Sequence, residues 1–498
     1  MKTGTLTAVS KRKTRSGCLT CKRVKCDETK PSCLRCIATK RICEGYSNPP
    51  QQALSFDSLT DDERRAFLLF RSRTAHRIFG HRDVEDWLPT LLQIGHSEAP
   101  VKHAITALAS LHESLEPGNA STSIRRSGKN AEISAQMLAL KHYTSAIKSV
   151  QTESPNMSHR PDIVLTLCIL FICFEQFRTG DAACLLHLRA GFKLLYWWRC
   201  NTATYGKLQE YSRTTLDFVN NKITPILQRL RVQFSLCMDS RHALKDLGVP
   251  LCLPLPTIPS TYSSRNSARL DFDRVMNHVF SSSERGIPTR YQAPRRAPST
   301  VLRQWKSALD SSQFSGESSV LQDCTIKLLN LYYHISIIIA ETYFSQSEMI
   351  FDNYLGHFQT AVELAENISR SWQDEPQNFS LIFSFDLGLT PPLFLVASRC
   401  RHPLIRRRAV NMMLHSPLYQ GAWKDRYSGL CAQRIIELEE ENAGIVVEQN
   451  DISESKRIRK VSADLQESQS EILMQFTRWP FEPDAPIHTT IVEFEKSI

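Results

Sequence analysis

The sequence predicts a small metal-organised domain at the amino terminus followed by a large all-α domain. Three observations support this prediction. Six of the fifteen cysteines lie between Cys18 and Cys43. Residues 1–50 hold twelve of the 61 Lys and Arg residues but three of the 51 Asp and Glu residues, so the rest of the chain is nearly neutral. After residue 58 the apolar residues recur with the period of a helix, and 498 residues are enough for two or three domains.

The cysteine cluster has the spacing C-x2-C-x4-C-x6-C-x2-C-x6-C, and its members are Cys18, Cys21, Cys26, Cys33, Cys36 and Cys43. Two thiolates separated by two residues can bind the same zinc ion. No apolar signal-peptide core precedes the cluster, so metal ligation by reduced thiols is favoured over disulfides. Six sulfurs can complete two tetrahedral zinc sites if two of them bridge both ions. Four cysteines around a single zinc ion and a redox C-x-x-C are the alternatives.

Positive charge surrounds these cysteines at Lys22, Arg23, Lys25, Lys30, Arg35, Lys40 and Arg41. Six thiolates and two Zn²⁺ ions sum to −2, which leaves this part of the chain with a charge of about +7. A compact cationic domain of this kind is suited to bind a polyanion. Residues 1–15 are expected to be a disordered basic tail. Its cations suit phosphate contacts, a nuclear import signal or plain solvation, and they are Lys11, Arg12, Lys13 and Arg15.

The residues that carry a family resemblance are Gly17-Cys18-Leu19-Thr20-Cys21, Arg23-Val24-Lys25-Cys26, Lys30-Pro31 and Cys43-Glu44-Gly45-Tyr46. Residues 16–46, called the head below, resemble the Zn2Cys6 binuclear-cluster DNA-binding domain of fungal transcription factors. The resemblance implies two zinc ions that share Cys18 and Cys33, and a nuclear protein whose first head helix reads CGG-type triplets of double-stranded DNA. It implies base contacts by Lys22, Arg23 and Lys25 and phosphate contacts by Lys11, Arg12, Lys13, Arg15, Arg35, Lys40 and Arg41.

One spacing departs from the family pattern, which has six residues between the second and third cysteines where this chain has four. Cys36 and Cys43 are seven residues apart and face the same way on a helix to within about 20°. Cys21 and Cys26 are five residues apart and about 140° out of phase. Either the helix unwinds, or the first zinc site is distorted, or the sequence has lost two codons. The alternative function is therefore a regulator with an impaired DNA-reading head that acts through protein contacts.

Residues 47–57 are a polar, proline-containing linker, and residues 58–498, called the body below, are expected to be all-α. The first body helix is predicted to begin at the capping box Thr60-Asp61-Asp62-Glu63. Residues 101–111 have one apolar helical face, and residues 324–344 are apolar enough for a buried central helix. Further helices are predicted around 140–150, 185–195, 213–238, 354–373, 402–415, 428–442 and 461–476, with one short strand at 489–494 and loops near 114–131 and 250–300.

Four strings of the body, at 67–71, 101–108, 399–409 and 421–423, carry a second resemblance. They are similar to the regulatory region that follows the zinc cluster in one large group of fungal factors. This resemblance implies regulation of genes transcribed by RNA polymerase II. A biosynthetic gene cluster is a common target in this group, and no particular effector is implied. The body is expected to form a homodimer or heterodimer, or to receive regulatory input.

No residue pattern indicates catalysis, so the protein is not expected to be an enzyme. Nucleotide-binding glycine motifs, H-E-x-x-H and G-x-S-x-G do not occur, and glycine is scarce at 18 residues. An enzyme with a zinc appendage is the weak third hypothesis. His103 and His112 are nine residues apart on opposite faces of one helix, so they are expected to be surface or core residues rather than metal ligands. No apolar run has the length of a membrane span.

Three further groups are expected to be structural. The acidic run at 437–441 is interpreted as a solvated helix face rather than an activation segment. The aromatic pair Trp197-Trp198 is expected to pack in the core rather than line a ligand pocket. Four cysteines without metal-ligand spacing are expected to behave as small buried apolar residues, and these are Cys168, Cys173, Cys184 and Cys200.

Overall fold

The structure is a computed structural model of the 498-residue chain. It describes residues 34–39, 59–115, 128–152, 160–178, 181–204, 211–237, 255–284, 297–314, 320–342, 345–374, 387–415, 425–465, 470–480 and 485–494. The chain forms two compact units, Met1–Thr60 and Asp61–Ile498. The described residues of the first unit include one short helix, α1 (Leu34–Ala38).

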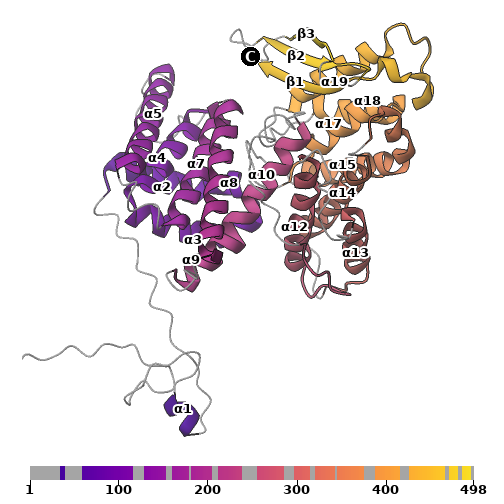
Figure 1. Ribbon diagram of the computed structural model, residues 1–498. Helices are drawn as coiled ribbons and strands as arrows, with labels where there is room; N and C mark the ends of the chain where they lie inside the picture. Colours follow the sequence, from indigo (N-terminus) through magenta and orange to yellow (C-terminus); the bar gives the residue numbers. More distant parts are fainter. Residues whose placement is uncertain are drawn as a thin grey trace, which may run out of the picture. The chain divides into compact units, whose positions relative to one another are not determined.

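The first part of the body is helical (Figure 1). Its elements are α2 (Asp61–Leu69), the π-helical turn η2 (Phe70–Thr74), α3 (Ala75–Ser97), α4 (Ala99–Leu115), α5 (Gly128–Thr152), α7 (Pro161–Arg178) and α8 (Asp181–Thr204). The predicted start of the first body helix is confirmed, because α2 begins at Asp61. In α4 the predicted apolar face is buried, and it packs against α2, α3, α5 and α7. This helix is therefore the centre around which the neighbouring helices are arranged.

The apolar face of α5 differs from the predicted one. The expected face includes Leu140, Tyr143 and Ile147, but the structure buries Ala139, Tyr143 and Ala146 and leaves Leu140 43% exposed. Because α5 lies close to α4, alanines fit at this contact better than leucine does. In α8 the predicted face consists of four apolar residues at helical spacing, of which Leu188, Phe192 and Leu195 are buried and Leu185 is half-buried.

The rest of the body continues with α9 (Arg213–Asp217), the π-helical turn η4 (Phe218–Ile223), α10 (Thr224–Cys237), α12 (Arg265–Glu284), α13 (Pro298–Asp310), α14 (Val320–Thr342), the 3-10 turn η5 (Glu348–Tyr354), α15 (Leu355–Asp374), α17 (Thr390–Arg399), α18 (Pro403–Leu414), α19 (Asp425–Glu440), η6 (Gln449–Asp451) and η7 (Glu454–Lys456). The predicted helices near 213–238, 324–344, 354–373, 402–415 and 428–442 are confirmed by these elements. The first of them contains the π-helical turn η4.

The expectation of a loop throughout 250–300 is wrong for residues 265–284, which form α12. Its buried side chains are Phe272, Val275, Met276 and Val279, which recur at the spacing of a helical face. The residues between them are polar, namely Asp273, Arg274, Asn277 and His278, so the segment resembles a loop in composition while keeping a helical period. At the other predicted loop, near 114–131, α4 extends to Leu115 and α5 begins at Gly128; residues 116–127 lie outside the described residues.

The helix predicted at 461–476 is also wrong. Residues there form β1 (Arg459–Leu465) and β2 (Glu471–Thr477), which join β3 (Ile487–Glu493) in an antiparallel sheet of order β1-β2-β3. In β2 the side chains of Ile472, Met474 and Phe476 alternate towards the core, as a half-buried strand requires. The short strand predicted at 489–494 is confirmed in position by β3, where Ile491 pairs with Leu473.

A large apolar core joins α10, α12–α15, α17–α19 and the inner face of the sheet. The helix α14 is buried on most sides, as predicted, and Trp305 of α13 donates its Nε1–H to the carbonyl of Ala268 at 2.8 Å. Figure 1 shows the strands beside α19, and β3 contacts that helix. Among the described residues, no helix combines the length and the apolar character that crossing a membrane requires. The body is thus mostly helical, with one small sheet near its end.

Candidate functional site

Two of the residues predicted to act in the head lie among the described residues, namely Arg35 and Cys36 of α1. Cys36 is 1% exposed, whereas Arg35 is exposed. The helix ends where Thr39 donates its backbone N–H to the carbonyl of Arg35 at 3.0 Å and its hydroxyl to the same carbonyl at 2.8 Å. An inward thiol beside an outward guanidinium fits a cysteine ligand next to a phosphate contact. The other predicted head residues lie outside the described part, and these are Lys11, Arg12, Lys13, Arg15, Cys18, Cys21, Lys22, Arg23, Lys25, Cys26, Cys33, Lys40, Arg41 and Cys43.

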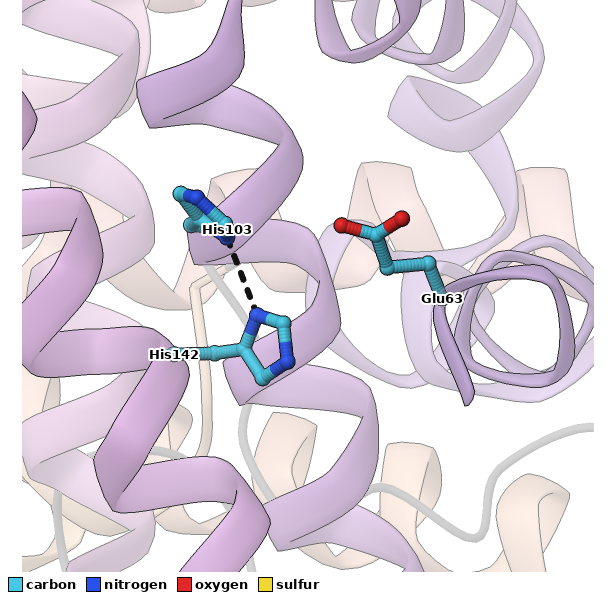
Figure 2. Close-up of side chains that lie close together, drawn as sticks. All are labelled: Glu63, His103 and His142. Atoms are coloured by element: carbon cyan, nitrogen blue, oxygen red, sulfur yellow. Dashed lines mark hydrogen bonds between the residues drawn. The ribbon is translucent and has the colours of Figure 1, made fainter. Parts of the chain in front are cut away.

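A cluster of three potential ligand side chains lies in the first part of the body (Figure 2). Glu63 comes from α2, His103 from α4 and His142 from α5. The Nδ1 atoms of His103 and His142 are 3.0 Å apart, so one ring donates its N–H to the other. The carboxylate of Glu63 is directed at the pair, and one ligand atom from each residue lies within 4.8 Å of the other two. In the described ranges, no other group of three His, Cys, Asp or Glu side chains meets this condition.

Burial determines the charge of this cluster. Glu63 is 5% exposed, and its Oε1 lies 3.1 Å from the Nζ of Lys102. Burial and then the charge of Lys102 lower the pKa of His103, while Glu63 opposes them. Burial and then His103 lower the pKa of His142. Both imidazoles are therefore neutral near pH 7, and a neutral imidazole has a lone pair that can bind a hydrogen-bond donor or a metal ion.

The sequence missed this cluster because its members are about forty residues apart and on three helices. The sequence analysis expects His103 and His112 on opposite faces of one helix. His112 is fully buried and has its own partners. The Nη1 of Arg77 donates to His112 Nε2 at 3.0 Å, so His112 carries its proton on Nδ1 and donates it to the Thr74 hydroxyl at 2.9 Å. His112 is thus a satisfied core residue, as expected.

A cavity of about 320 Å³ opens between α8, η4, α10 and α12. Two of its lining side chains are Arg199 and Arg274. Arg199 donates from Nη2 to Asn220 Oδ1 and to Thr224 Oγ1, both at 3.1 Å. Burial and then the nearby charge of Arg274 lower the pKa of Arg199 to about 10. Arg274 in turn pairs with Asp271 at 3.4 Å, so one of the two positive charges in the cavity has its own carboxylate partner.

A buried ion network lies at the start of α18, where the string 399–409 carries the second family resemblance. Arg401 donates from Nη1 to Glu348 Oε2 at 3.1 Å and from Nη2 to Glu439 Oε1 at 2.8 Å. Arg399 reaches the same Glu348 oxygen at 2.8 Å, and Arg406 reaches Glu439 Oε2 at 2.7 Å. The network joins η5, the α17–α18 connection and α19. Because its arginines and carboxylates pair with one another in the interior, the network has a structural role.

The carboxylates of this network remain ionised despite their burial. Burial opposes ionisation of Glu439, but Arg401 and Arg406 outweigh it and lower its pKa to about 2. Burial likewise opposes ionisation of Glu348, and the arginines around it lower its pKa. The interpretation of the acidic run 437–441 as a solvated face is therefore wrong for Glu439, which is fully buried, although Glu437 is 48% exposed. The run straddles the two faces of α19.

The cysteines of the body behave largely as predicted. Cys168, Cys173 and Cys184 are buried, and Cys200 is half-buried. Burial raises the pKa of Cys168 to about 12, so its thiol stays protonated and unreactive at neutral pH. The two tryptophans of the pair Trp197-Trp198 differ in burial. Trp198 is 3% exposed and packs in the core, whereas Trp197 is 50% exposed. The prediction that both pack in the core is correct for Trp198 alone.

Comparison with known proteins supports a regulator of transcription. Residues 68–216, which include most of the first part of the body, match the family described as "Fungal specific transcription factor domain". The matched range contains His103 and His142 of the three-residue cluster, and Glu63 lies just before it. No solved structure matches the chain.

Three curated relatives carry names that describe regulation. The Aspercryptin biosynthesis cluster-specific transcription regulator atnN of Emericella nidulans is 21% identical over 87% of this chain and 88% of its own length. The transcription regulator lscL of Purpureocillium lilacinum is 22% identical over 66% of this chain and 87% of its own length. The transcriptional regulatory protein moc3 of Schizosaccharomyces pombe is 52% identical over 56 residues, or 11% of each chain. These similarities support a fungal transcription regulator, a class whose members are usually not enzymes.

Proposed function

We propose that the protein is a zinc-dependent, sequence-specific DNA-binding regulator of RNA polymerase II genes in the nucleus. The observation that carries the proposal is the set of six cysteines in one basic stretch. Their thiolates suit two zinc ions if two sulfurs bridge. In the head, Arg23 and Lys22, with Lys25, would read the guanines of CGG-type triplets.

The described part of the head supports zinc binding by its donor chemistry. In a unit of about sixty residues, a side chain can be buried only against a small interior, yet Cys36 is 1% exposed. Its neighbours Arg35, Ala38 and Thr39 are exposed, so α1 turns its cysteine inwards. Zinc bound by such thiolates would supply the folding free energy that a short chain lacks, on the order of 10 kcal/mol per structural site.

The charge of the head supports DNA as its partner. Arg35 is exposed, whereas Cys36 beside it is buried, so its guanidinium can meet a phosphate. Lysine and arginine on the remaining head residues would add phosphate contacts and make the affinity fall as salt rises. An arginine or lysine in the major groove can donate two hydrogen bonds to guanine O6 and N7, which would give a preference for guanine at the contacted positions of a CGG-type triplet.

The proposal extends to the target genes. The relative that aligns with 87% of this chain is named as specific for a biosynthesis cluster. The alignment covers 87% of the chain, so it includes most of the body. We therefore infer that this protein regulates a biosynthetic gene cluster, with the body as the part that dimerises or receives the regulatory input.

Selection of bound sites from random DNA tests this function. The full chain is purified with zinc, its ions are counted by native mass spectrometry, and the selection is repeated after exhaustive chelation. We expect two zinc ions in the head, enrichment of CGG-type triplets, and loss of enrichment without metal. Enrichment that is unchanged by chelation contradicts zinc dependence, and no enrichment from the zinc-loaded chain contradicts sequence-specific reading.

The second candidate function is a regulator that acts through its helical body with an impaired head, and the four-residue spacing between Cys21 and Cys26 favours it. In that case the head would bind one zinc ion or none and would select no triplet. Co-purification with an intact relative would then be required for DNA binding. The zinc count of a Cys36→Ser variant provides the control, since this substitution removes a ligand from the undamaged half of the motif.

A further inference from the structure

We propose that Glu63, His103 and His142 form a binding site for a divalent transition-metal ion, with Zn²⁺ as the best match, that joins helices α2, α4 and α5. The site belongs to the body and is separate from the cysteines of the head. A bound ion would cross-link the three helices at the start of the body, where α4 packs against both α2 and α5.

The distances fit a metal site. In a tetrahedral zinc site with Zn–N bonds of about 2.0–2.1 Å, two ligand nitrogens are separated by roughly 3.3–3.4 Å. The Nδ1 atoms of His103 and His142 are already 3.0 Å apart, and a ligand atom of Glu63 lies within 4.8 Å of both. The two rings would separate by a few tenths of an ångström, and the carboxylate would move closer by a χ rotation.

The ligand chemistry fits as well. Two imidazoles and one carboxylate are a recurring zinc-binding set, and the same donors suit Cu²⁺ and Ni²⁺ but suit Ca²⁺ and Mg²⁺ poorly. Both rings are half-buried and neutral. The ring that donates its Nδ1–H to the other would carry this proton on Nε2 when it ligates, so both Nδ1 lone pairs become available with no net loss of a proton. Glu63 supplies the single negative charge, and its 5% exposure means that the charge is not shielded by water. Water would complete the coordination from the exposed side of the rings.

Lys102 makes a distinctive contribution, since it competes with the metal. Its Nζ lies 3.1 Å from Glu63 Oε1, and its side chain is 24% exposed. A divalent cation at the cluster would repel this ammonium group and take over its carboxylate. The lysine can swing into solvent, so it lowers metal affinity without blocking the site. Removal of its charge should therefore strengthen metal binding, which a purely structural hydrogen bond between two histidines does not predict.

The body contains a matched pair for comparison. His334 of α14 and His357 of α15 also place their Nδ1 atoms 2.8 Å apart, and burial lowers the pKa of His334 to about 4. Within the described part of the chain, this pair belongs to no group of three ligand side chains. It therefore has the same imidazole contact without the carboxylate that completes the first cluster, and it separates metal binding from histidine pairing.

The first test counts ions by native mass spectrometry of the full chain after equilibration with zinc. One variant carries His103→Asn and His142→Asn, and its control carries His334→Asn and His357→Asn. Asparagine keeps an amide near the position of Nδ1 but is a poor zinc ligand. Ions in the head are common to both chains and cancel in the comparison. We expect one zinc ion fewer in the first variant than in wild type and in the control; equal counts in all three overturn the proposal.

The second test follows unfolding of the body with tryptophan fluorescence, because the first tryptophan of the chain is Trp87 and the head contains none. Wild type should melt at a higher temperature with zinc than with a chelator, since an ion bound to the folded state stabilises that state. Lys102→Gln should enlarge this shift and Glu63→Gln should abolish it. If the asparagine variant fails to fold, the zinc-dependent shift in the melting temperature of Lys102→Gln still tests the proposal. A zinc-dependent shift that is the same in wild type, Lys102→Gln and Glu63→Gln overturns the proposal.

Discussion

Arg401 and Glu439 form an ion pair with 2.8 Å between Nη2 and Oε1, and neither side chain exposes any surface. The pair connects the start of α18 to the last turns of α19. Arg406 holds the second oxygen of the same carboxylate at 2.7 Å, and the backbone N–H of Ile458 donates to Oε1 at 2.8 Å. One carboxylate therefore accepts hydrogen bonds from two buried guanidinium groups and from the chain that leads into β1.

Replacement of Glu439 by alanine should be severely destabilising. It leaves Arg401 and Arg406 buried without their shared counter-charge, and loss of one partner of a buried pair costs about 3–5 kcal/mol. Glu437→Ala is the matched control on the same helix, because its side chain is 48% exposed and pairs with Arg434 at the surface. The control should lose at most about 1 kcal/mol. Urea unfolding followed by tryptophan fluorescence measures both, and equal losses would contradict the buried-network assignment.

Stability should also depend on pH through the same carboxylate. Its pKa is about 2 in the folded chain against an ordinary value of 4.5, so the folded state binds the Glu439 proton less tightly than the unfolded state does. The resulting stabilisation is complete above the ordinary pKa and is lost as the pH falls from about 5 towards 2. Urea midpoints measured along this range should fall less steeply in Glu439→Gln than in wild type. An identical pH slope in the two chains would show that Glu439 does not contribute.

The helices of the body could be predicted because each buries one face along a continuous stretch of sequence. Residues 461–476 show where this reasoning fails. Ile472 and Phe476 are four residues apart, which fits a helix as well as the alternating face of a strand. Strand pairing selects the strand over the helix, since β2 pairs with β1 on one side and β3 on the other. The local period of apolar residues carries no information about these partners. Tertiary pairing therefore overrides the local pattern.

The candidate sites also differ in whether the sequence alone predicts them. The cysteines of the head are close together in sequence, so their spacing alone indicates metal chemistry. The contact between His103 and His142 depends on the packing of α4 against α5, and no spacing in the sequence records it. Glu439 is another example, because an acidic run looks solvated until α18 brings Arg401 and Arg406 against one of its members. Sites built from several helices require the packing to be known.

Two glycines predict opposite effects of alanine. A Cβ at Gly356 of α15 meets no atom within 4 Å, so Gly356→Ala should stabilise the body by about 0.5–1 kcal/mol through its better helix propensity. A Cβ at Gly429 of α19 would lie 2.9 Å from Leu414 Cδ2 and 3.2 Å from the Leu414 backbone nitrogen. Gly429→Ala should therefore destabilise by about 1–3 kcal/mol. Thermal unfolding compares the two, and a gain in stability from Gly429→Ala would contradict the α18–α19 packing.

Base reading by the head and phosphate contact by the basic tail should be separable by mutation. Arg23→Ala should cost about 1–3 kcal/mol on DNA with a CGG triplet and much less on random DNA, because it removes a contact to a base. Lys13→Ala should weaken binding to both DNAs about equally and reduce the salt slope by about 1. Fluorescence anisotropy at several salt concentrations measures affinity and slope together. Equal losses on both DNAs from both substitutions would refute the assignment of Arg23 to the bases.

The spacing between Cys21 and Cys26 predicts that two added residues improve the head. Inserting Ala-Ala after Lys22 separates these cysteines by seven residues, the separation of Cys36 and Cys43, and turns them to within about 20° of each other on a helix. It also lengthens the base-reading segment by about 3 Å. Affinity for CGG-containing DNA should rise by about tenfold or more, a gain of roughly 1.4 kcal/mol. The control inserts Ala-Ala after Gln52, in the linker, and should leave affinity unchanged. Weaker binding after the Lys22 insertion would mean that the four-residue spacing is already the working geometry of this head.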